Sequence, residues 1–143
     1  MIQTVHIING PNLNFLGKRE TDIYGNQTME SILEELKKHF FSLNIVYYQS
    51  NHEGEIIDYI QKNFDIFEGI VINPGAFSHY SIAILDALKP LKCPVIEVHL
   101  SNIHQRETFR NHSITAQASK GVITGFGKYS YFLAIQYLIY QNG

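Results

Sequence analysis

The fold is decided by residues 69–99, GIVINPGAFSHYSIAILDALKPLKCPVIEVH. Gly69–Asn73 is a short apolar run rich in β-branched residues, which is typical of a buried strand. Ser81–Leu88 has helical spacing and ends before Pro90, and Pro94–His99 is a second apolar strand. A strand, a helix and a strand in this order form a βαβ unit, whose two strands lie parallel in one sheet.

The same alternation continues on both sides of this unit. Val5–Asn9, Asn44–Tyr48 and Gly121–Thr124 are predicted strands. The further predicted helices are one capped by Thr28 with Ile32, Leu33, Leu36 and Phe40 on its apolar face, one marked by Ile56, Ile57, Ile60 and Phe64, and a terminal one over Tyr131–Tyr140. Five strands in this pattern predict an α/β fold, a flavodoxin-like doubly wound five-stranded parallel sheet with helices on both faces. A barrel would need about eight strands.

Length and composition are those of one ordinary globular domain, which we predict to span residues 1–143. A net charge of -2 without a basic cluster argues against nucleic acid or an anionic membrane as the main partner. The single Cys93 fits a reducing compartment. The first residues resemble no signal peptide and no apolar run reaches membrane-spanning length, so we expect a cytoplasmic protein.

Polar residues gather just past the ends of four predicted strands. In an open parallel sheet, ligands bind at these carboxyl ends, near the point where the strand order reverses. We therefore expect one site at this edge of the sheet. The four sets are Asn9 with Asn12, Gln49-Ser50-Asn51-His52-Glu53-Gly54-Glu55, Asn73-Pro74-Gly75-Ala76-Phe77-Ser78-His79, and Glu97-Val98-His99-Leu100-Ser101-Asn102.

Glu97 and His99 are two residues apart on one predicted strand, so their side chains project from the same face. A carboxylate beside an imidazole fixes the tautomer of the ring and suits it to donate a proton near neutral pH. A buried histidine that is hydrogen-bonded to a nearby acid without any catalytic role explains this pair equally well.

His79 and Asp86 are seven residues apart, close to two helical turns, so one helix would carry both on one face. They could reach the same ligand hydroxyl. Taken alone, the pair is better explained as a histidine at a helix start and a surface carboxylate.

Arg110 follows the charge-mixed residues 103–109, which we interpret as a short exposed helix. Glu107 adjoins Arg106, so we interpret Arg106 as a surface residue. We interpret Arg110 as the cation without an acidic neighbour, available to an anion or a polyol.

A long loop of residues 8–25 follows the first predicted strand and contains Arg19 and Tyr24. A loop of this length in a small domain is uncommon unless it binds or covers something. A tyrosine with its usual pKa of about 10 is a poor base, but a neighbouring guanidinium favours the phenolate. The loop could thus carry an activated tyrosine, or a solvated cation and a packing residue. Gly17 and Gly25 would supply hinges for a mobile lid over residues 16–25.

Signatures of other chemistries are weak. The sequence has 7 histidines but neither a His-Glu-x-x-His helix nor a Cys-x-x-Cys pair, so no metal site is predicted. The phosphate-binding glycine motifs and the Gly-x-Ser-x-Gly turn of serine hydrolases are also missing. Gly125-Phe126-Gly127 is interpreted as a tight turn.

Taken together, the motifs resemble the type II 3-dehydroquinate dehydratase family. The resemblance spans nearly the whole chain, with Thr21, Phe15 and Ser130 as departures at positions where the family usually has proline, leucine and glycine. The motifs are Asn9-Gly10-Pro11-Asn12-Leu13-Asn14 with Gly17-Lys18-Arg19-Glu20 and Tyr24-Gly25, Gln49 to Glu55, Asn73 to His79 with Asp86-Ala87-Leu88, Glu97 to His104 with Phe109-Arg110, and Gly121-Val122-Ile123 with Gly125-Phe126-Gly127.

The resemblance implies dehydration of 3-dehydroquinate to 3-dehydroshikimate through an enolate, without a cofactor, in the shikimate pathway. It also implies a homo-oligomer, a dodecamer built from trimers. The implied catalytic residues are Tyr24 as base, Arg19 to lower its pKa, Asn12 to hold a water at the enolate oxygen, His99 as acid and Glu97 to orient His99. The implied substrate contacts are Asn73 with the Leu100-Ser101 backbone for the carboxylate, His79 and Arg110 for ring hydroxyls, and Asp86 from a neighbouring subunit.

Two other functions stay open at this level. A binding module for a small anion or nucleotide would not turn its ligand over. A hydrolase could use Glu97 and His99 to activate water, but it would not need Arg19 and Tyr24 on a loop. Neither alternative explains the motif set.

Overall fold

The computed structural model describes residues 1–18 and 21–141, with the side chains of Thr21 and Tyr24 outside the description. Its strands form one sheet in the order β2-β1-β3-β4-β5, with every neighbouring pair parallel. The strands are β1 (Thr4–Asn9), β2 (Asn44–Gln49), β3 (Ile70–Asn73), β4 (Val95–His99) and β5 (Gly121–Thr124). The predicted flavodoxin-like sheet is confirmed, and each predicted strand agrees to within one residue at either end.

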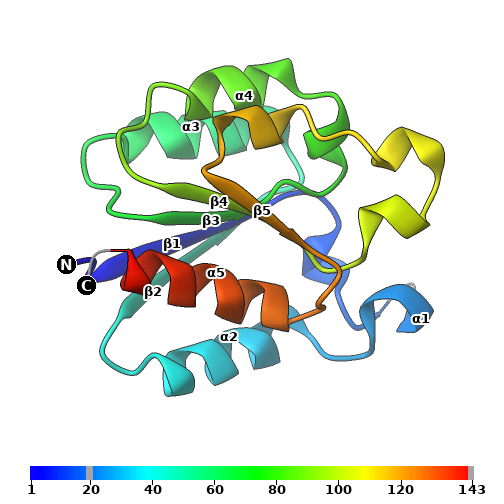
Figure 1. Cartoon of the computed structure of the whole chain (residues 1–143), viewed down its shortest axis with the longest axis horizontal. Helices are drawn as coiled ribbons and strands as arrows, with labels where there is room; N and C mark the ends of the chain where they lie inside the picture. Colours follow the sequence, from blue (N-terminus) through cyan, green and yellow to red (C-terminus); the bar gives the residue numbers. More distant parts are fainter. Residues whose placement is uncertain (19–20, 142–143) are drawn as a thin grey trace.

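Helices cover both faces of the sheet (Figure 1). α2 (Met29–His39) and α5 (Tyr129–Tyr140) pack on one face, while α3 (Glu53–Lys62) and α4 (Ile82–Leu88) pack on the other. Because both faces are covered, the central strands are apolar on both sides, as the uninterrupted apolar runs predicted.

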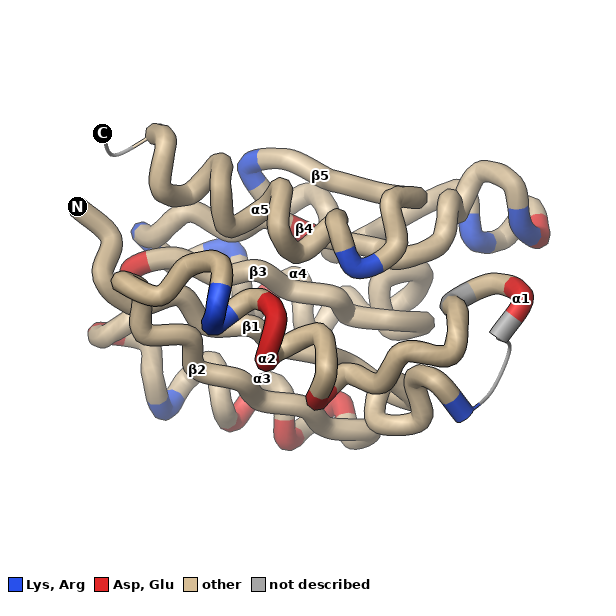
Figure 2. Tube along the Cα trace, turned by 90° about the horizontal axis from the view of Figure 1, so that it is seen from below, with Lys and Arg blue, Asp and Glu red and all other residues tan. Residues whose placement is uncertain are grey.

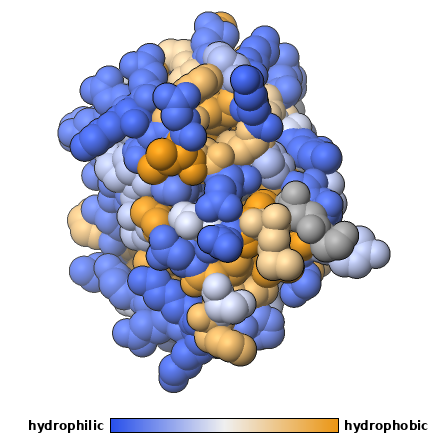
Figure 3. Space-filling view, turned by 90° about the vertical axis from the view of Figure 1, so that its left-hand side faces the viewer, coloured by the Kyte–Doolittle hydropathy of each residue, from blue (hydrophilic) through white to orange (hydrophobic). Residues whose placement is uncertain are grey.

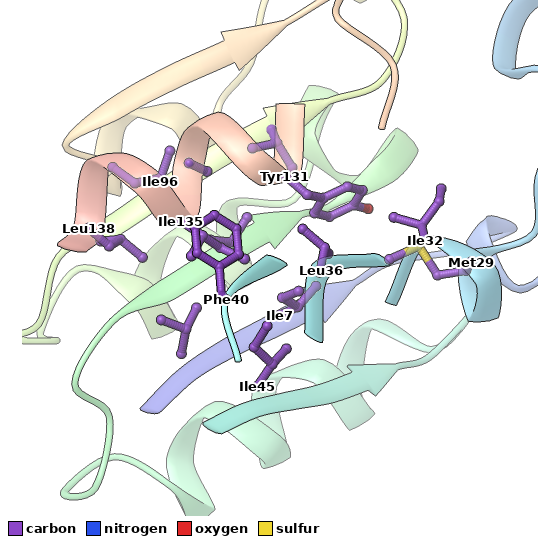
Figure 4. Packing of buried hydrophobic residues seen from close by; sticks show 14 of the residues in the cluster. Ile7, Met29, Ile32, Leu36, Phe40, Ile45, Ile96, Tyr131, Ile135 and Leu138 are labelled. Carbon is purple, nitrogen blue, oxygen red and sulfur yellow. The ribbon is translucent and has the colours of Figure 1, made fainter. Parts of the chain in front are cut away.

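The larger core lies between the sheet and the pair α2 and α5. Figure 4 shows Ile7 and Ile45 from the strands meeting Leu36 from α2 and Ile135 from α5. Tyr131 belongs to the same layer and is fully buried. The second core joins Ile8 and Ile72 to α3 and α4.

Side-chain caps begin two helices where the sequence predicted them. The hydroxyl of Thr28 accepts a hydrogen bond from the Ser31 amide at 3.2 Å, and that of Ser81 accepts one from the Ile84 amide at 3.0 Å. Each cap satisfies an amide that has no partner within the helix.

Two predicted elements differ from the structure. α3 ends before Phe64, because the Asn63 side chain donates to the Tyr59 carbonyl at 2.8 Å and terminates the helix. The single helix expected over residues 103–109 is two separate 3-10 turns, η3 (Ile103–Gln105) and η4 (Thr108–Arg110). Arg106 between them has an extended backbone, which prevents a continuous helix.

The surface carries charges of both signs, with Lys and Arg interspersed among Asp and Glu (Figure 2). The end of the molecule that holds the termini is mainly hydrophilic, with separate hydrophobic patches (Figure 3). Within the described ranges, no helix combines the length and the apolar character that a membrane span requires.

The loops that follow β1 and β3 touch through their backbones. A Cβ atom built on Gly10 would lie 2.2 Å from the Pro74 carbonyl oxygen, far inside contact distance. The Gly10 amide also donates to the Asn73 carbonyl at 2.8 Å. Only glycine permits this approach, so Gly10 determines how closely the two loops meet.

We expect Gly10→Ala to lower the free energy of unfolding by about 2 kcal/mol or more, because the methyl group overlaps backbone that cannot move aside. Gly54→Ala is the matched control, since a Cβ at this position in α3 meets nothing within 4 Å. The control should be neutral or stabilising by about 0.5–1 kcal/mol, because alanine favours helix. Denaturant unfolding of both variants checks this, and equal stability of the two would contradict it.

Candidate active site

A cleft opens at the carboxyl ends of the strands, at the β1–β3 boundary where the strand order reverses. Asn9 and Asn73, the last residues of β1 and β3, are directly paired there. The cleft is lined by Pro11, Asn12, Leu13, Leu16, Asn73, Gly75, Ala76, His79, His99, Leu100, Ser101, Ile103, Arg106 and Arg110. The structure thus brings together the polar sets predicted after the first, third and fourth strands.

The floor of this region is a buried hydrogen-bond network centred on Tyr131. The Tyr131 hydroxyl donates to Asn9 Oδ1 at 2.8 Å and accepts from Asn73 Nδ2 at 3.2 Å. Asn9 Nδ2 donates to the Tyr47 hydroxyl at 3.3 Å. Burial raises the pKa of Tyr47 to about 12 and that of Tyr131 well above its usual value, so both phenols stay protonated.

Asn12, near the start of the long loop, has a left-handed backbone conformation, with φ of 69°. Its amide donates to Asn51 Oδ1 at 2.9 Å. Gln49 Nε2 donates to the same oxygen and to the Gly10 carbonyl, both at 3.1 Å. A non-glycine residue with positive φ persists only where its surroundings hold it.

The polar set after the second strand therefore has a different place from the one we predicted. Gln49 and Asn51 lie behind the Asn12 turn and support it, whereas the expectation placed them at the ligand. The reason is that β2 is an edge strand, one position further from the switch point than β1.

Glu97 and His99 project from the same face of β4, as their spacing predicted. His99 Nε2 lies 2.8 Å from Glu97 Oε2, and both side chains are buried. A carboxylate accepts hydrogen bonds, so Nε2 carries a proton and Nδ1 is left for other partners. Ser113 and Thr115 also donate to Glu97, Ser113 at 2.6 Å. We did not predict these two hydroxyls, and their only sequence signal is a Ser-x-Thr spacing outside any predicted strand or helix.

His79 lines the cleft, but the interpretation that one helix carries His79 and Asp86 on one face is wrong, and Asp86 is the surface carboxylate of the alternative interpretation. His79 ends the 3-10 turn η2 (Gly75–His79), and the backbone breaks at Tyr80 before α4 begins. Asp86 is exposed on α4 and does not line the cleft. Because the two residues belong to different elements, their spacing of seven does not place them on one face.

The pKa of His79 is lowered by partial burial, and the nearby His99 and Arg110 lower it further. The hydrogen bond from Nδ1 to the His112 carbonyl at 2.8 Å and the charge of Glu97 oppose this shift. A carbonyl only accepts, so Nδ1 carries the proton. Neutral His79 can then accept a hydrogen bond at Nε2, for example from a ligand hydroxyl.

The surroundings of the two arginines after β4 differ from those we predicted. Arg110 does have an acidic neighbour, because its Nε hydrogen-bonds the Glu107 carboxylate three residues earlier. Arg106, which we interpreted as a surface residue, lines the cleft and donates from Nη1 to Ser101 Oγ at 3.3 Å. The extended backbone at Arg106 separates the two turns η3 and η4.

The long loop is described only in part. Its glycines have the left-handed backbone that suits hinges, with φ of 88° at Gly17 and 76° at Gly25. Tyr24 ends the short helix α1 (Thr21–Tyr24). Arg19 and the side chain of Tyr24 lie outside the described residues, so their pairing and the closure of the loop stay predictions.

Among residues 1–18 and 21–141, no group of three or more His, Cys, Asp and Glu side chains is arranged to bind one ion.

Comparisons with known proteins show the family of this chain. The sequence profile described as "Dehydroquinase class II" matches residues 3–139. A 3-dehydroquinate dehydratase of Clostridium botulinum strain Hall is 55% identical over 140 residues, which cover 96% of this chain and 95% of that protein. The chain belongs to the class II dehydroquinase family.

Solved structures of the class II dehydroquinase family have the same fold. The type II dehydroquinase from Butyrivibrio crossotus superposes with a TM-score of 0.93 at 46% identity, covering 96% of this chain and 98% of that one. The enzyme from Propionibacterium acnes gives 0.91 at 41% identity, covering 96% and 97%. The cleft therefore lies in a fold that these two class II dehydroquinases share over 96% of this chain.

We expect Tyr131→Phe to lower the free energy of unfolding by about 1–3 kcal/mol, because it leaves Asn9 Oδ1 without its donor in a buried site. Tyr129→Phe makes the same change at a side chain that is 59% exposed and should cost well under about 0.5 kcal/mol. Chemical denaturation of both variants measures the difference. Equal effects would show that the buried network contributes nothing to stability.

Proposed function

We propose that this chain is a lyase that converts 3-dehydroquinate into 3-dehydroshikimate in the shikimate pathway of aromatic amino acid biosynthesis. The observation that carries the proposal is a family match over residues 3–139 together with a relative of 55% identity that bears the name of this enzyme. The cleft supports it, because His99, whose ring is hydrogen-bonded to the buried Glu97, lines one space with two arginines at the switch point of the sheet.

The proposed reaction removes a proton next to the ketone and then the hydroxyl β to it. Tyr24 takes the proton, with Arg19 favouring its phenolate form. The electron pair moves to the ketone oxygen, giving an enolate that a water held by Asn12 stabilises. When the enolate collapses, the hydroxyl departs with a proton from His99, and one water is lost overall. No cofactor takes part in these steps.

His99 is well placed for this role because Glu97 occupies its Nε2. The ring nitrogen Nδ1 can then face the departing hydroxyl, while Glu97 stabilises the protonated ring. Glu97 is a positioning residue in this scheme, since it acts through His99.

The remaining cleft residues are proposed to hold the substrate. Backbone amides at Leu100 and Ser101 and the side chain of Asn73 would bind the carboxylate. Asn73 keeps one amide N–H for this, since Tyr131 takes the other. His79 and Arg110 would bind ring hydroxyls, as their places on the cleft wall allow.

We further propose a cytoplasmic homo-oligomer, a dodecamer assembled from trimers. Asp86 would then reach the cleft of a neighbouring subunit, a role for which its exposure on α4 leaves it available. Light scattering coupled to size exclusion measures the oligomer, and a monomer at working concentration would contradict this part of the proposal.

The decisive experiment follows ultraviolet absorption of the conjugated enone product after 3-dehydroquinate is added to the folded protein. We expect turnover that survives exhaustive chelation. A folded protein without turnover, or one revived only by a divalent cation, would overturn the proposed activity. A binding module would bind the substrate and leave the absorbance unchanged.

Tyr24→Phe should reduce kcat by about a hundredfold to ten-thousandfold, the usual contribution of a general base, with substrate affinity nearly unchanged. Arg19→Ala should raise the pKa of Tyr24, so the rise of activity with pH moves to higher pH. Arg19→Lys should restore part of the activity, because lysine keeps the charge without the planar fork. A Tyr24→Phe variant within about threefold of wild type would place the base elsewhere.

His99→Ala should be impaired more severely than Glu97→Gln, because the glutamate only orients the imidazole and stabilises its charge. Steady-state kinetics and circular dichroism on both variants test this order. Similar defects accompanied by loss of folding in both would favour a purely structural buried pair.

A further inference from the structure

We infer that Ser113 and Thr115 are positioning residues of the active site, whose hydroxyls hold the Glu97 carboxylate in the orientation that meets His99. Ser113 lies between the 3-10 turns η4 and η5 (Thr115–Ala118), and Thr115 is the first residue of η5. The inference rests on the proposed dehydration, because it assigns these residues a part in the same proton transfer.

The hydrogen-bond partners of the two hydroxyls determine to which atoms they donate their protons. Each hydroxyl has one proton to donate. Ser113 Oγ accepts from the Ala116 amide at 3.2 Å and donates to Glu97 Oε2 at 2.6 Å. Thr115 donates to the other carboxylate oxygen, Oε1. The 3.3 Å approach between Ser113 and Thr115 is then a contact, since both protons are already used.

Three donors therefore converge on one fully buried carboxylate. Ser113 and His99 share Oε2, and Thr115 alone occupies Oε1. Because both oxygens are bound from the side of the 112–115 segment, the plane of the carboxylate cannot rotate freely. His99 then receives an acceptor of fixed direction, which is what an aligned proton donor requires.

The same segment also holds the second histidine of the cleft. The carbonyl of His112 accepts from His79 Nδ1 at 2.8 Å, and the Ile114 amide donates to the Ser78 carbonyl at 2.6 Å. The rings of His79 and His99 lie 6.3 Å apart. Residues 112–115 thus hold the His79 ring directly and the His99 ring through Glu97, and they connect β4 to the turn η2 by hydrogen bonds.

Removing one of these hydroxyls should lower catalysis without displacing the substrate. A hydrogen bond to a charged group corresponds to about a tenfold effect or more. We expect Thr115→Val to lower kcat by about tenfold while KM changes by less than about threefold. Thr115→Ser retains the hydroxyl and should stay within about threefold of wild type. Ser113→Ala should resemble Thr115→Val.

The test that separates positioning from general stability is a double-mutant cycle with Glu97→Gln. If Thr115 acts through Glu97, adding Thr115→Val to Glu97→Gln should change kcat by less than about twofold, because the carboxylate it orients is already lost. Thr4→Val serves as the matched control, because Thr4 lies at the start of β1, at the other end of the sheet. It should leave kcat unchanged in both backgrounds.

Each other outcome overturns the inference. A kcat of Thr115→Val equal to that of wild type, an undiminished loss in the Glu97→Gln background, or a Thr115→Ser variant as impaired as Thr115→Val would each do so. Failure of both Ser113→Ala and Thr115→Val to fold would assign the hydroxyls to stability alone. If only one of the two variants folds, the kcat of that variant decides the outcome. These outcomes presuppose an active wild-type protein, whereas an inactive folded wild type contradicts the proposed function itself.

Discussion

The backbone contact between Gly10 and Pro74 is the constraint on which the rest of the site depends. It brings the loop after β1 against the loop after β3 at the point where the strand order reverses. An open sheet leaves a crevice at such a point, and here the contact determines its width. Beneath it, Tyr131 joins Asn9 to Asn73, so the two strand ends are also held through their side chains.

Above this floor, the cleft is built in layers. Most residues that line the cleft follow the ends of β1, β3 and β4, while residues one layer behind hold them in place. Gln49 and Asn51 support the strained Asn12, and Ser113 and Thr115 support Glu97. Catalytic geometry must be held within a fraction of an ångström, and this second layer of hydrogen bonds is how a small domain can achieve that.

The proposed base and acid come from two different kinds of structure. His99 lies on a central strand, where packing on both faces and Glu97 restrict its ring. Tyr24 belongs to a loop bounded by Gly17 and Gly25, both with left-handed backbone. A rigid acid and a loop-borne base suit a site that must admit its substrate and then exclude water from the proton transfers.

Residues close together in the sequence determined most of the strands and helices of this protein. The periodicity of apolar residues predicted the strands and α-helices, Thr28 marked a helix start, and the spacing of Glu97 and His99 placed both on one face of β4, because these features depend on local backbone geometry. The motifs also identified the family.

Only the tertiary structure decided which residues form the layer behind the cleft and where the two arginines lie. Ser113 lies sixteen residues from Glu97, and Asn51 thirty-nine from Asn12, so their contacts exist only once the strand order has been set. Arg106 lines the cleft from between two turns, and the break at Tyr80 separated His79 from Asp86. Sequence spacing predicts neighbours within an element, but neighbours across elements depend on how loops cross the end of the sheet.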